Sequence, residues 1–241
     1  MNGILRIAVA IGICIILYIL AGCGPGEEMG TIVFTSNRNG NAEIYSMRAD
    51  GKKQKRLTKN ECSDEAPWWS PDRSRLVFTS DRTGNWDIFV MNADGTSPVQ
   101  LTNSEKDDRF PCWSPDGKKI LFQSNQEGRY ELYIMNPDGT DLRRIKIREE
   151  VPPPGKKKVL KAPIKKDISK EIKPEYTHPV WFPNCSSLIY MKESKTGASL
   201  WKTGMDGKKP EQLTRTKKWD MCPSVAPDGS RILFSSNESD E

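Results

Sequence analysis

Short apolar runs that end in an aromatic residue recur along the chain at a fixed interval. They read TIVF, RLVF, KILF, SLIY and RILF, and they end at Phe34, Phe78, Phe122, Tyr190 and Phe234. The spacings between these residues are 44, 44, 68 and 44. Short runs rich in β-branched and aromatic residues are typical of β-strands, and a constant period of this length is typical of repeat folds. The pattern therefore predicts an array of similar β-units.

Two kinds of turn repeat in the same register as these runs. Asp-Gly pairs lie at 50–51, 94–95, 138–139 and 206–207, and Ser-Pro-Asp turns or their variants lie at 70–72, 114–117, 182–184 and 226–229. Both sequences favour tight turns between strands. One unit then reads as an inner strand such as 110–113, a second strand at 119–124, a third at 131–135 and a short outer strand. Four strands in about 40 to 45 residues are the size of one propeller blade.

The repeat resembles a known family. Its pattern is Pro-x-Trp-Ser-Pro-Asp-Gly, an apolar strand ending in Phe-x-Ser-Asn/Asp-Arg, and Ile-Tyr-x-Met-x-x-Asp-Gly, and it is similar to the WD-repeat-like β-propeller repeat of the TolB family over residues 31–145 and 177–236. The resemblance implies an all-β propeller of four-stranded blades that acts as a non-catalytic protein-binding or scaffolding module in the bacterial envelope. It also implies envelope partners, of which a peptidoglycan-associated lipoprotein is the example that TolB itself binds. Propellers host many unrelated activities, so the fold alone does not fix the function.

The number of blades stays open between four and five. Strands counted in order give three from 31 to 58, three full blades, and two strands from 221 to 236, before a tail at 237–241. Four blades result if Met221 to Val225 supplies the inner strand that the first unit lacks. The alternatives are an open arc completed by another chain and a gene product that ends early, since propellers of the TolB type usually have six blades.

The first 22 residues are predicted to be a secretory signal peptide, helical in its apolar part. Arg6 is the single charge, and 16 uncharged residues follow from Ile7 to Gly22. A helix needs about 20 apolar residues to span a bilayer, so this run fits a signal better than a membrane anchor.

The signal closes on four residues with a chemistry of their own. Leu20, Ala21, Gly22 and Cys23 resemble the lipobox of bacterial lipoproteins, which implies cleavage after Gly22 and a diacylglycerol on the Cys23 sulfur. Each buried methylene contributes about 0.8 kcal/mol, so two or three acyl chains hold a domain on a membrane. Residues 23–30 then form a tether, and Gly24 favours the periplasmic face of the outer membrane in a two-membrane organism. We expect an extracytoplasmic, lipid-anchored protein.

The positive charge of the chain is concentrated in one insertion. The formal net charge is +5, and the 68-residue interval exceeds the period by 24 residues that fall within 146–176. This stretch is rich in Lys and Pro and is predicted to be an exposed loop. It is either a solvated insertion without a partner or an electrostatic contact for an anionic surface through Lys156, Lys157, Lys158, Lys165 and Lys166. The rest of the mature chain is close to neutral, so we expect no nucleic-acid partner.

Catalytic and metal-binding patterns are scarce. His178 is the one histidine, which excludes two-histidine zinc sites, and no G-x-S-x-G nucleophile motif is present. Loops such as 81–87 lack the residue order of a calcium loop, so their Asp and Asn residues are interpreted as turn caps. We therefore expect no enzyme, no metal and no cofactor. The alternative is a small-ligand or carbohydrate receptor, or an enzyme, that uses the central channel near His178.

The tryptophans fall into two groups. Trp69, Trp113 and Trp181 are repeat-equivalent and are predicted to fill the space between blades, whereas carbohydrate stacking would need exposed rings outside the repeat pattern, for which the candidates are Trp86, Trp201 and Trp219.

Four cysteines remain after the signal peptide and the lipidated residue: Cys62, Cys112, Cys185 and Cys222. They allow three disulfide pairings, which the sequence does not distinguish. A Cys62–Cys222 disulfide that ties the first unit to the last is one hypothesis.

Overall fold

The computed structural model describes residues 30–148, 174–194, 197–215 and 219–237, and within these ranges the chain is entirely β. Seventeen strands form five antiparallel sheets, which confirms the predicted all-β propeller architecture. The predicted signal-peptide helix, the lipobox with Cys23, the five lysines of the insertion and the end of the tail lie outside the described residues.

The order of strands follows the predicted repeat. The first sheet has three strands, β1 (Thr31–Ser36), β2 (Glu43–Arg48) and β3 (Lys55–Arg56). The second has β4 (Asp64–Trp69), β5 (Arg75–Ser80), β6 (Asp87–Asn92) and β7 (Val99–Gln100), and the third has β8 (Asp108–Trp113), β9 (Ile120–Ser124), β10 (Glu131–Met135) and β11 (Arg143–Arg144). The fourth has β12 (Glu175–Trp181), β13 (Ser187–Ser194), β14 (Gly197–Gly204) and β15 (Glu211–Gln212), and the last has only β16 (Asp220–Val225) and β17 (Ile232–Ser236).

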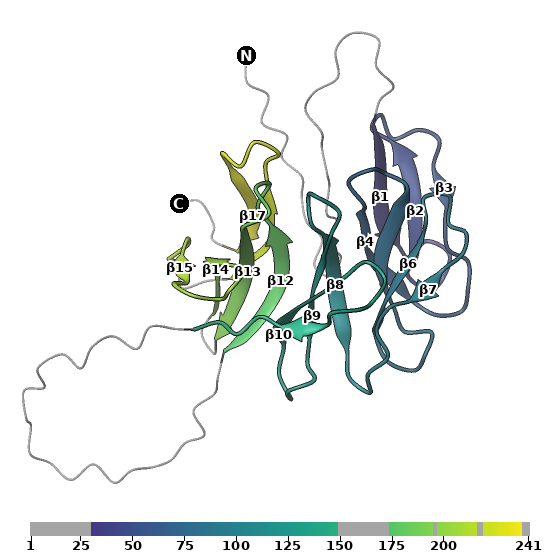
Figure 1. Cartoon of the computed structure of the whole chain (residues 1–241). Coiled ribbons are helices and arrows are strands. Elements are labelled where there is room, and N and C mark those ends of the chain that lie inside the picture. Colours follow the sequence, from purple (N-terminus) through teal and green to yellow (C-terminus); the bar gives the residue numbers. More distant parts are fainter. Residues whose placement is uncertain (1–29, 149–173, 195–196, 216–218, 238–241) are drawn as a thin grey trace, which may run out of the picture.

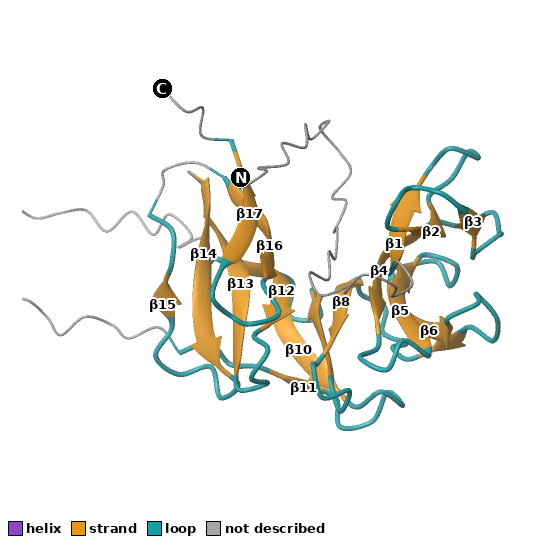
Figure 2. Cartoon of the chain, turned by 90° about the horizontal axis from the view of Figure 1, so that it is seen from above, coloured by secondary structure: helices purple, strands orange, loops and turns teal. Residues whose placement is uncertain are grey.

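The five sheets are arranged as an arc whose two ends are the first and the last sheet (Figures 1 and 2). No described strand of the first sheet lies against the last sheet. In a closed four-blade ring, β16 would pair with β1 and serve as the inner strand of the first sheet. Instead β16 pairs with β17, as β4 pairs with β5 and β8 with β9, so the edge that β1 would need is occupied. The four-blade ring closed by Met221 to Val225 is therefore not formed, and the described chain is an open arc.

A β-bulge in each inner strand joins neighbouring sheets. The bulged residues have positive φ although none is glycine, for example 52° at Ala66, 52° at Phe110 and 48° at His178. Their backbone N–H groups turn towards the preceding sheet, where they donate to Thr35 Oγ1 (3.1 Å), Thr79 Oγ1 (3.2 Å) and Gln123 Oε1 (2.9 Å), respectively. These bonds satisfy donors that the bulge removes from the strand ladder, and they fix how one sheet stacks on the next.

The core lies between adjacent sheets. The aromatic residues in the middle of the second strands of the three complete sheets, Phe78, Phe122 and Tyr190, are fully buried. The Asp-Gly turns also pack closely on the neighbouring sheet: a Cβ on Gly139, whose φ is 84°, would lie 2.9 Å from the Leu101 carbonyl oxygen. Glycine is required there both by its backbone conformation and by the approach of another backbone.

Candidate functional site

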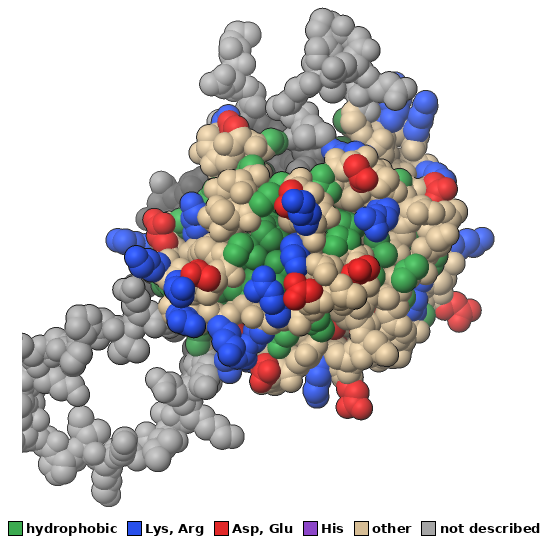
Figure 3. All heavy atoms as spheres, in the orientation of Figure 1, with side chains coloured by type: hydrophobic (Ala, Val, Ile, Leu, Met, Phe, Trp, Pro, Cys, Tyr) green, Lys and Arg blue, Asp and Glu red, His purple; other side chains and the backbone are tan. Residues whose placement is uncertain are grey.

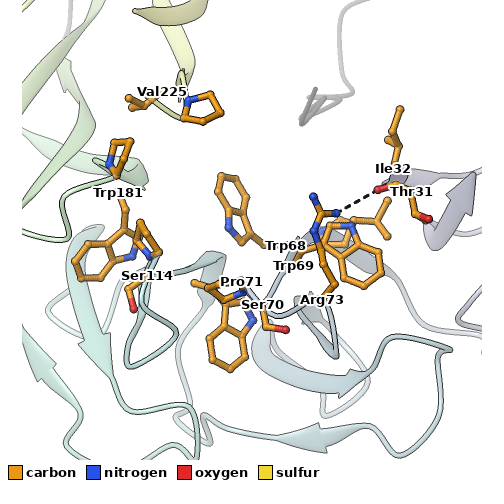
Figure 4. A pocket seen from close by; sticks show the side chains of 16 residues that line it. Thr31, Ile32, Trp68, Trp69, Ser70, Pro71, Arg73, Ser114, Trp181 and Val225 are labelled. Atoms are coloured by element: carbon orange, nitrogen blue, oxygen red, sulfur yellow. Dashed lines mark hydrogen bonds between the residues drawn. The ribbon is translucent and has the colours of Figure 1, made fainter. Parts of the chain in front are cut away.

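A cavity of about 300 Å³ opens on the face of the arc where the inner strands end at their Ser-Pro-Asp turns (Figure 4). We call this cavity the funnel. Its walls are mostly aromatic and proline rings: Trp68, Trp69, Trp113, Trp181, Pro67, Pro71, Pro115, Pro183 and Pro227. Ser70, Arg73 and Ser114 also line it. Thr31, Ile32 and Val33 of β1 and Val225 of β16 complete the lining, so the funnel is bordered by both ends of the open arc.

The repeat-equivalent tryptophans form the inter-sheet wall of the funnel, as predicted. Trp113 and Trp181 are buried and Trp69 is half-buried. The guanidinium groups of Arg73 and Arg75 lie 5.5 Å and 4.9 Å from the ring centroids of Trp69 and Trp113. The indole N–H groups of all three tryptophans are buried without a hydrogen-bond partner. The tryptophans therefore contribute apolar surface to the funnel, because their N–H groups are not accessible from it.

Trp68 closes the floor of the funnel, and the repeat pattern did not point to it. Its position on the inner strand is held by Cys112, Val180 and Ser224 in the other sheets. Its half-buried side chain packs against the apolar clusters of three different sheet interfaces. In Figure 4 its ring stands between Trp181 and Trp69. The doublet Trp68-Trp69 was the signal for it in the sequence.

The funnel carries little charge. Among the described residues that line it, Arg73 alone is charged, and its Nη1 donates to the Thr31 carbonyl oxygen (3.4 Å). On the face seen in Figure 3, Lys and Arg side chains are interspersed with Asp and Glu side chains. This agrees with the near-neutral balance predicted for the chain outside the insertion. The surface that the funnel offers is therefore mainly apolar, with one positive charge at Arg73.

His178 lies below the funnel in a second cavity of about 20 Å³, lined by the bulged residues of the inner strands. Its ring is 4.2 Å from that of Phe110, measured between centroids. Burial lowers the pKa of His178 to about 4, and its Nδ1 atom has no hydrogen-bond partner among the described residues. A cavity of this size holds about one water molecule. It has no room for a sugar or a metabolite.

The candidates for carbohydrate stacking are scattered. Trp86 is half-buried under the Arg109 guanidinium, which lies 4.1 Å from its ring centroid. Trp201 is a half-buried residue of β14 that packs on the core, and Trp219 is 37% exposed. The structure does not bring the three rings to one site.

The carboxylates of the acidic loops accept hydrogen bonds from neighbouring residues of the chain. Asp81 Oδ1 accepts from the Ser63 N–H (2.7 Å), and Asp87 accepts from Thr83 Oγ1 (2.6 Å) and Gln100 Nε2 (3.1 Å). Over the described ranges, no group of three His, Cys, Asp or Glu side chains is placed to hold a metal ion. The same ranges contain no helix that is long and apolar enough to cross a membrane.

The Cys62–Cys222 disulfide does not form. Cys62 is a half-buried free thiol in the loop between β3 and β4, near the beginning of the arc, whereas Cys222 lies on β16 of the last sheet. The hypothesis that this bridge ties the first unit to the last is therefore not borne out, because the Cys62 thiol is free. Cys112 and Cys185 are free thiols as well.

The comparisons with known proteins agree with this geometry. The profile of the TolB beta propeller domain matches residues 59–241. A protein of Agrobacterium tumefaciens assigned to TolB is 19% identical, with a TM-score of 0.66 over 87% of this chain and 71% of that one. TolB from Acinetobacter baumannii is 17% identical, with a TM-score of 0.66 over 87% of this chain and 48% of that one.

A chain of a nidogen/laminin complex is 10% identical, with a TM-score of 0.64 over 86% of this chain and 67% of that one, so the fold extends to proteins of very different sequence. A comparison with curated proteins finds no similar sequence. Together, the 44-residue repeat, the sheets it forms and the matching profile lead to one assignment. The chain belongs to the TolB β-propeller domain family.

Proposed function

We propose that this protein is a lipid-anchored, extracytoplasmic propeller whose funnel binds a segment of an envelope protein, so that the domain acts as a non-catalytic scaffold. A peptidoglycan-associated lipoprotein is the kind of partner that the family suggests. The observation that carries the proposal is the composition of the funnel, which has walls of tryptophan and proline rings and a single charged side chain.

This lining suits an extended peptide better than a reacting small molecule. Aromatic-lined grooves recognise extended and proline-rich segments because flat rings pack on them without ordering many rotamers. Catalysis would need a nucleophile, an acid or a base that converge on one reacting atom. His178, which holds a neutral ring beside Phe110, lies in a cavity of about 20 Å³ below the funnel.

The anchor rests on the sequence of the first 23 residues. A lipid on Cys23 would hold the propeller at a membrane surface within the length of the short tether at 23–30, where the funnel can meet a partner attached to the envelope. A Cys23→Ser variant should lose incorporated labelled palmitate and move from the membrane to the soluble fraction. Retention of label and membrane association in this variant would contradict the anchor.

The funnel is tested with a photo-crosslinking residue at Pro115, on its rim. Pro137 provides the matched control, because both prolines follow the first residue of a turn closed by a glycine N–H, from Gly117 to Ser114 O (2.9 Å) and from Gly139 to Asn136 O (3.0 Å). Pro115 lines the funnel and Pro137 belongs to an Asp-Gly hairpin at the outer side of the third sheet. We expect a defined crosslinked envelope protein from position 115 and none from position 137. Equal yields at both positions would refute binding in the funnel.

A further inference from the structure

Arg73, the charged residue of the funnel lining, stands where the repeat favours glycine. The turn that ends the inner strand reads Ser-Pro-Asp-Gly at 114–117 and Ala-Pro-Asp-Gly at 226–229, but Ser-Pro-Asp-Arg at 70–73, and the fourth sheet has Cys185 at this position. The turns are closed alike, by the N–H of Arg73 on Ser70 O (2.9 Å) and by that of Gly117 on Ser114 O (2.9 Å). The φ angle is 61° at Arg73 and 72° at Gly117. Glycine adopts this conformation freely and arginine does not, so the backbone gives no reason for an arginine here.

The side chain of Arg73 reaches the funnel and leaves most of its donors unused there. Its guanidinium lies 5.5 Å from the ring centroid of Trp69, and its Nη1 donates to the Thr31 carbonyl oxygen at 3.4 Å (Figure 4). A guanidinium has five N–H donors in a planar fork, and this long bond uses one of them. The carboxylate next to it in the chain, Asp72, accepts instead from Ser70 Oγ (2.6 Å) and from the Ser74 N–H (3.1 Å). Among the described residues, Arg73 forms no ion pair.

Two other arginines of the second sheet differ from Arg73 in this respect. Arg82 forms an ion pair with the buried Asp64 (2.9 Å). Arg75 lies over the ring of Trp113, 4.9 Å from its centroid, but does not line the funnel. Arg73 therefore combines an open guanidinium fork with a place in a mostly apolar cavity, where hydrogen bonds to a charged group are stronger than in water.

We propose that Arg73 determines which segment the funnel accepts, by binding the carboxylate of an Asp or Glu side chain that is flanked by a proline or aromatic residue in the partner protein. A guanidinium fork donates two parallel hydrogen bonds to a carboxylate, which fixes the orientation of the segment as well as its charge. The rings of Trp69 and Pro71 next to Arg73 offer the apolar contact for the flanking residue. This inference rests on the proposed function, because it names the chemistry of the segment that the funnel binds.

The test uses the full lipidated chain in its envelope, with the photo-crosslinking residue at Pro115, and compares the crosslink yields of Arg73 variants. Arg73→Glu should lower the yield at least about tenfold, because it places two negative charges opposite each other. Arg73→Lys should lower it less, since a lysine keeps the charge and loses the fork. Arg73→Gly should also lower the yield, yet it fits the turn, so it should unfold at a temperature no lower than that of the unmodified chain. Loss of the crosslink without loss of stability separates binding from folding.

Arg75→Gln is the matched control for Arg73→Gln. Both arginines are half-buried and both lie over a tryptophan of the funnel wall, but Arg73 alone of the two lines the funnel. We expect Arg73→Gln to lower the crosslink yield and Arg75→Gln to leave it unchanged. An equal loss in both variants would overturn the proposal, because the arginines would then act only through the packing of the tryptophans. An unchanged yield in Arg73→Gln would overturn it as well.

The carboxylate is tested by exchanging the two charges. Mass spectrometry of the crosslinked product identifies the partner segment, and its acidic residues are replaced by lysine one at a time. One replacement should restore crosslinking to Arg73→Glu. A segment without Asp or Glu, or no restoration by any replacement, would overturn the proposal while the funnel remained a binding site. Absence of a crosslink from Pro115 in the unmodified chain would refute the proposed function and this inference with it.

Discussion

Two equivalent buried aspartates differ in one partner, and this difference predicts how stability depends on pH. Asp64 and Asp108 begin the inner strands of successive sheets, and both are 0% exposed. Arg82 Nη2 lies 2.9 Å and 3.1 Å from the two carboxylate oxygens of Asp64. At the position of Arg82 the next sheet has Gln126, and Asp108 Oδ1 has no hydrogen-bond partner. We expect Gln126→Arg to stabilise the protein.

The size of the stabilisation expected from Gln126→Arg follows from the pKa of Asp108. Burial raises this pKa from 3.8 to about 6, and the nearby Asp87 carboxylate adds to the shift. The folded state therefore holds the proton more tightly than the unfolded state. Ionised Asp108 destabilises the folded state, and this destabilisation is absent below about pH 4, grows as the pH rises, and is complete above about pH 6. One pKa unit corresponds to about 1.4 kcal/mol, so ionised Asp108 costs about 3 kcal/mol at neutral pH.

The local geometry favours the new ion pair. The backbone N–H of Gln126 lies 3.3 Å from Ser124 Oγ, and that of Arg82 lies 3.4 Å from Ser80 Oγ, so an arginine at 126 starts from the same backbone position. A charged hydrogen bond to a buried carboxylate contributes about 1.5 to 3 kcal/mol. Gln126→Arg should therefore raise the free energy of unfolding by about 1 to 3 kcal/mol near pH 7.5 and by much less near pH 4.

Urea unfolding followed by tryptophan fluorescence between pH 4 and pH 8 measures this difference. Arg82→Gln is the reciprocal control, and it should lower stability near neutral pH by about 3 to 5 kcal/mol because it leaves the Asp64 charge buried and unpaired. A gain for Gln126→Arg that is equal at pH 4 and pH 8, or no gain at either pH, would refute the reasoning.

Two further predictions concern the repeat turns and the channel. Gly139→Ala should lower the free energy of unfolding by about 1 to 2 kcal/mol for its positive φ and by a further 1 to 3 kcal/mol for the contact with the Leu101 carbonyl. Gly51→Ala, which has a φ of 79° and no atom within 4 Å of the new Cβ, should show the loss for the positive φ alone. Equal losses for the two variants in chemical denaturation would contradict the close approach at Gly139. Burial lowers the pKa of His178 from 6.5 to about 4, so its contribution to stability is complete above pH 6.5 and is lost as the pH falls towards 4. His178→Phe should remove this loss, measured as the difference from the unmodified chain at each pH, and an unchanged acid profile would show that the ring is solvated.

The sequence predicted the sheets but not the way they are linked. The 44-residue period located the second strands because core residues must recur wherever sheets stack, and β5, β9, β13 and β17 lie where the apolar runs predicted them. The bulges were not predictable, because their positive φ occurs at Ala66, Phe110 and His178, which share no side-chain property that favours it. Ring closure could not be predicted either, because the local sequence pattern of β16 does not show whether it pairs with β1 of the first sheet or with β17.

In the funnel too, the repeat predicts some of the lining residues and misses others. Its walls are repeat-equivalent tryptophans and prolines, which the period identified as packing positions without indicating that they border a cavity. Its floor is Trp68, which a comparison of repeats passes over, because the equivalent positions hold the smaller residues Cys112 and Val180. A centre built from identical repeats would place the same side chain on every inner strand, and large rings from all of them would collide there. One indole among small neighbours fills this space and packs on three sheet interfaces at once. The residue that gives the funnel its floor is therefore, of necessity, one that breaks the repeat.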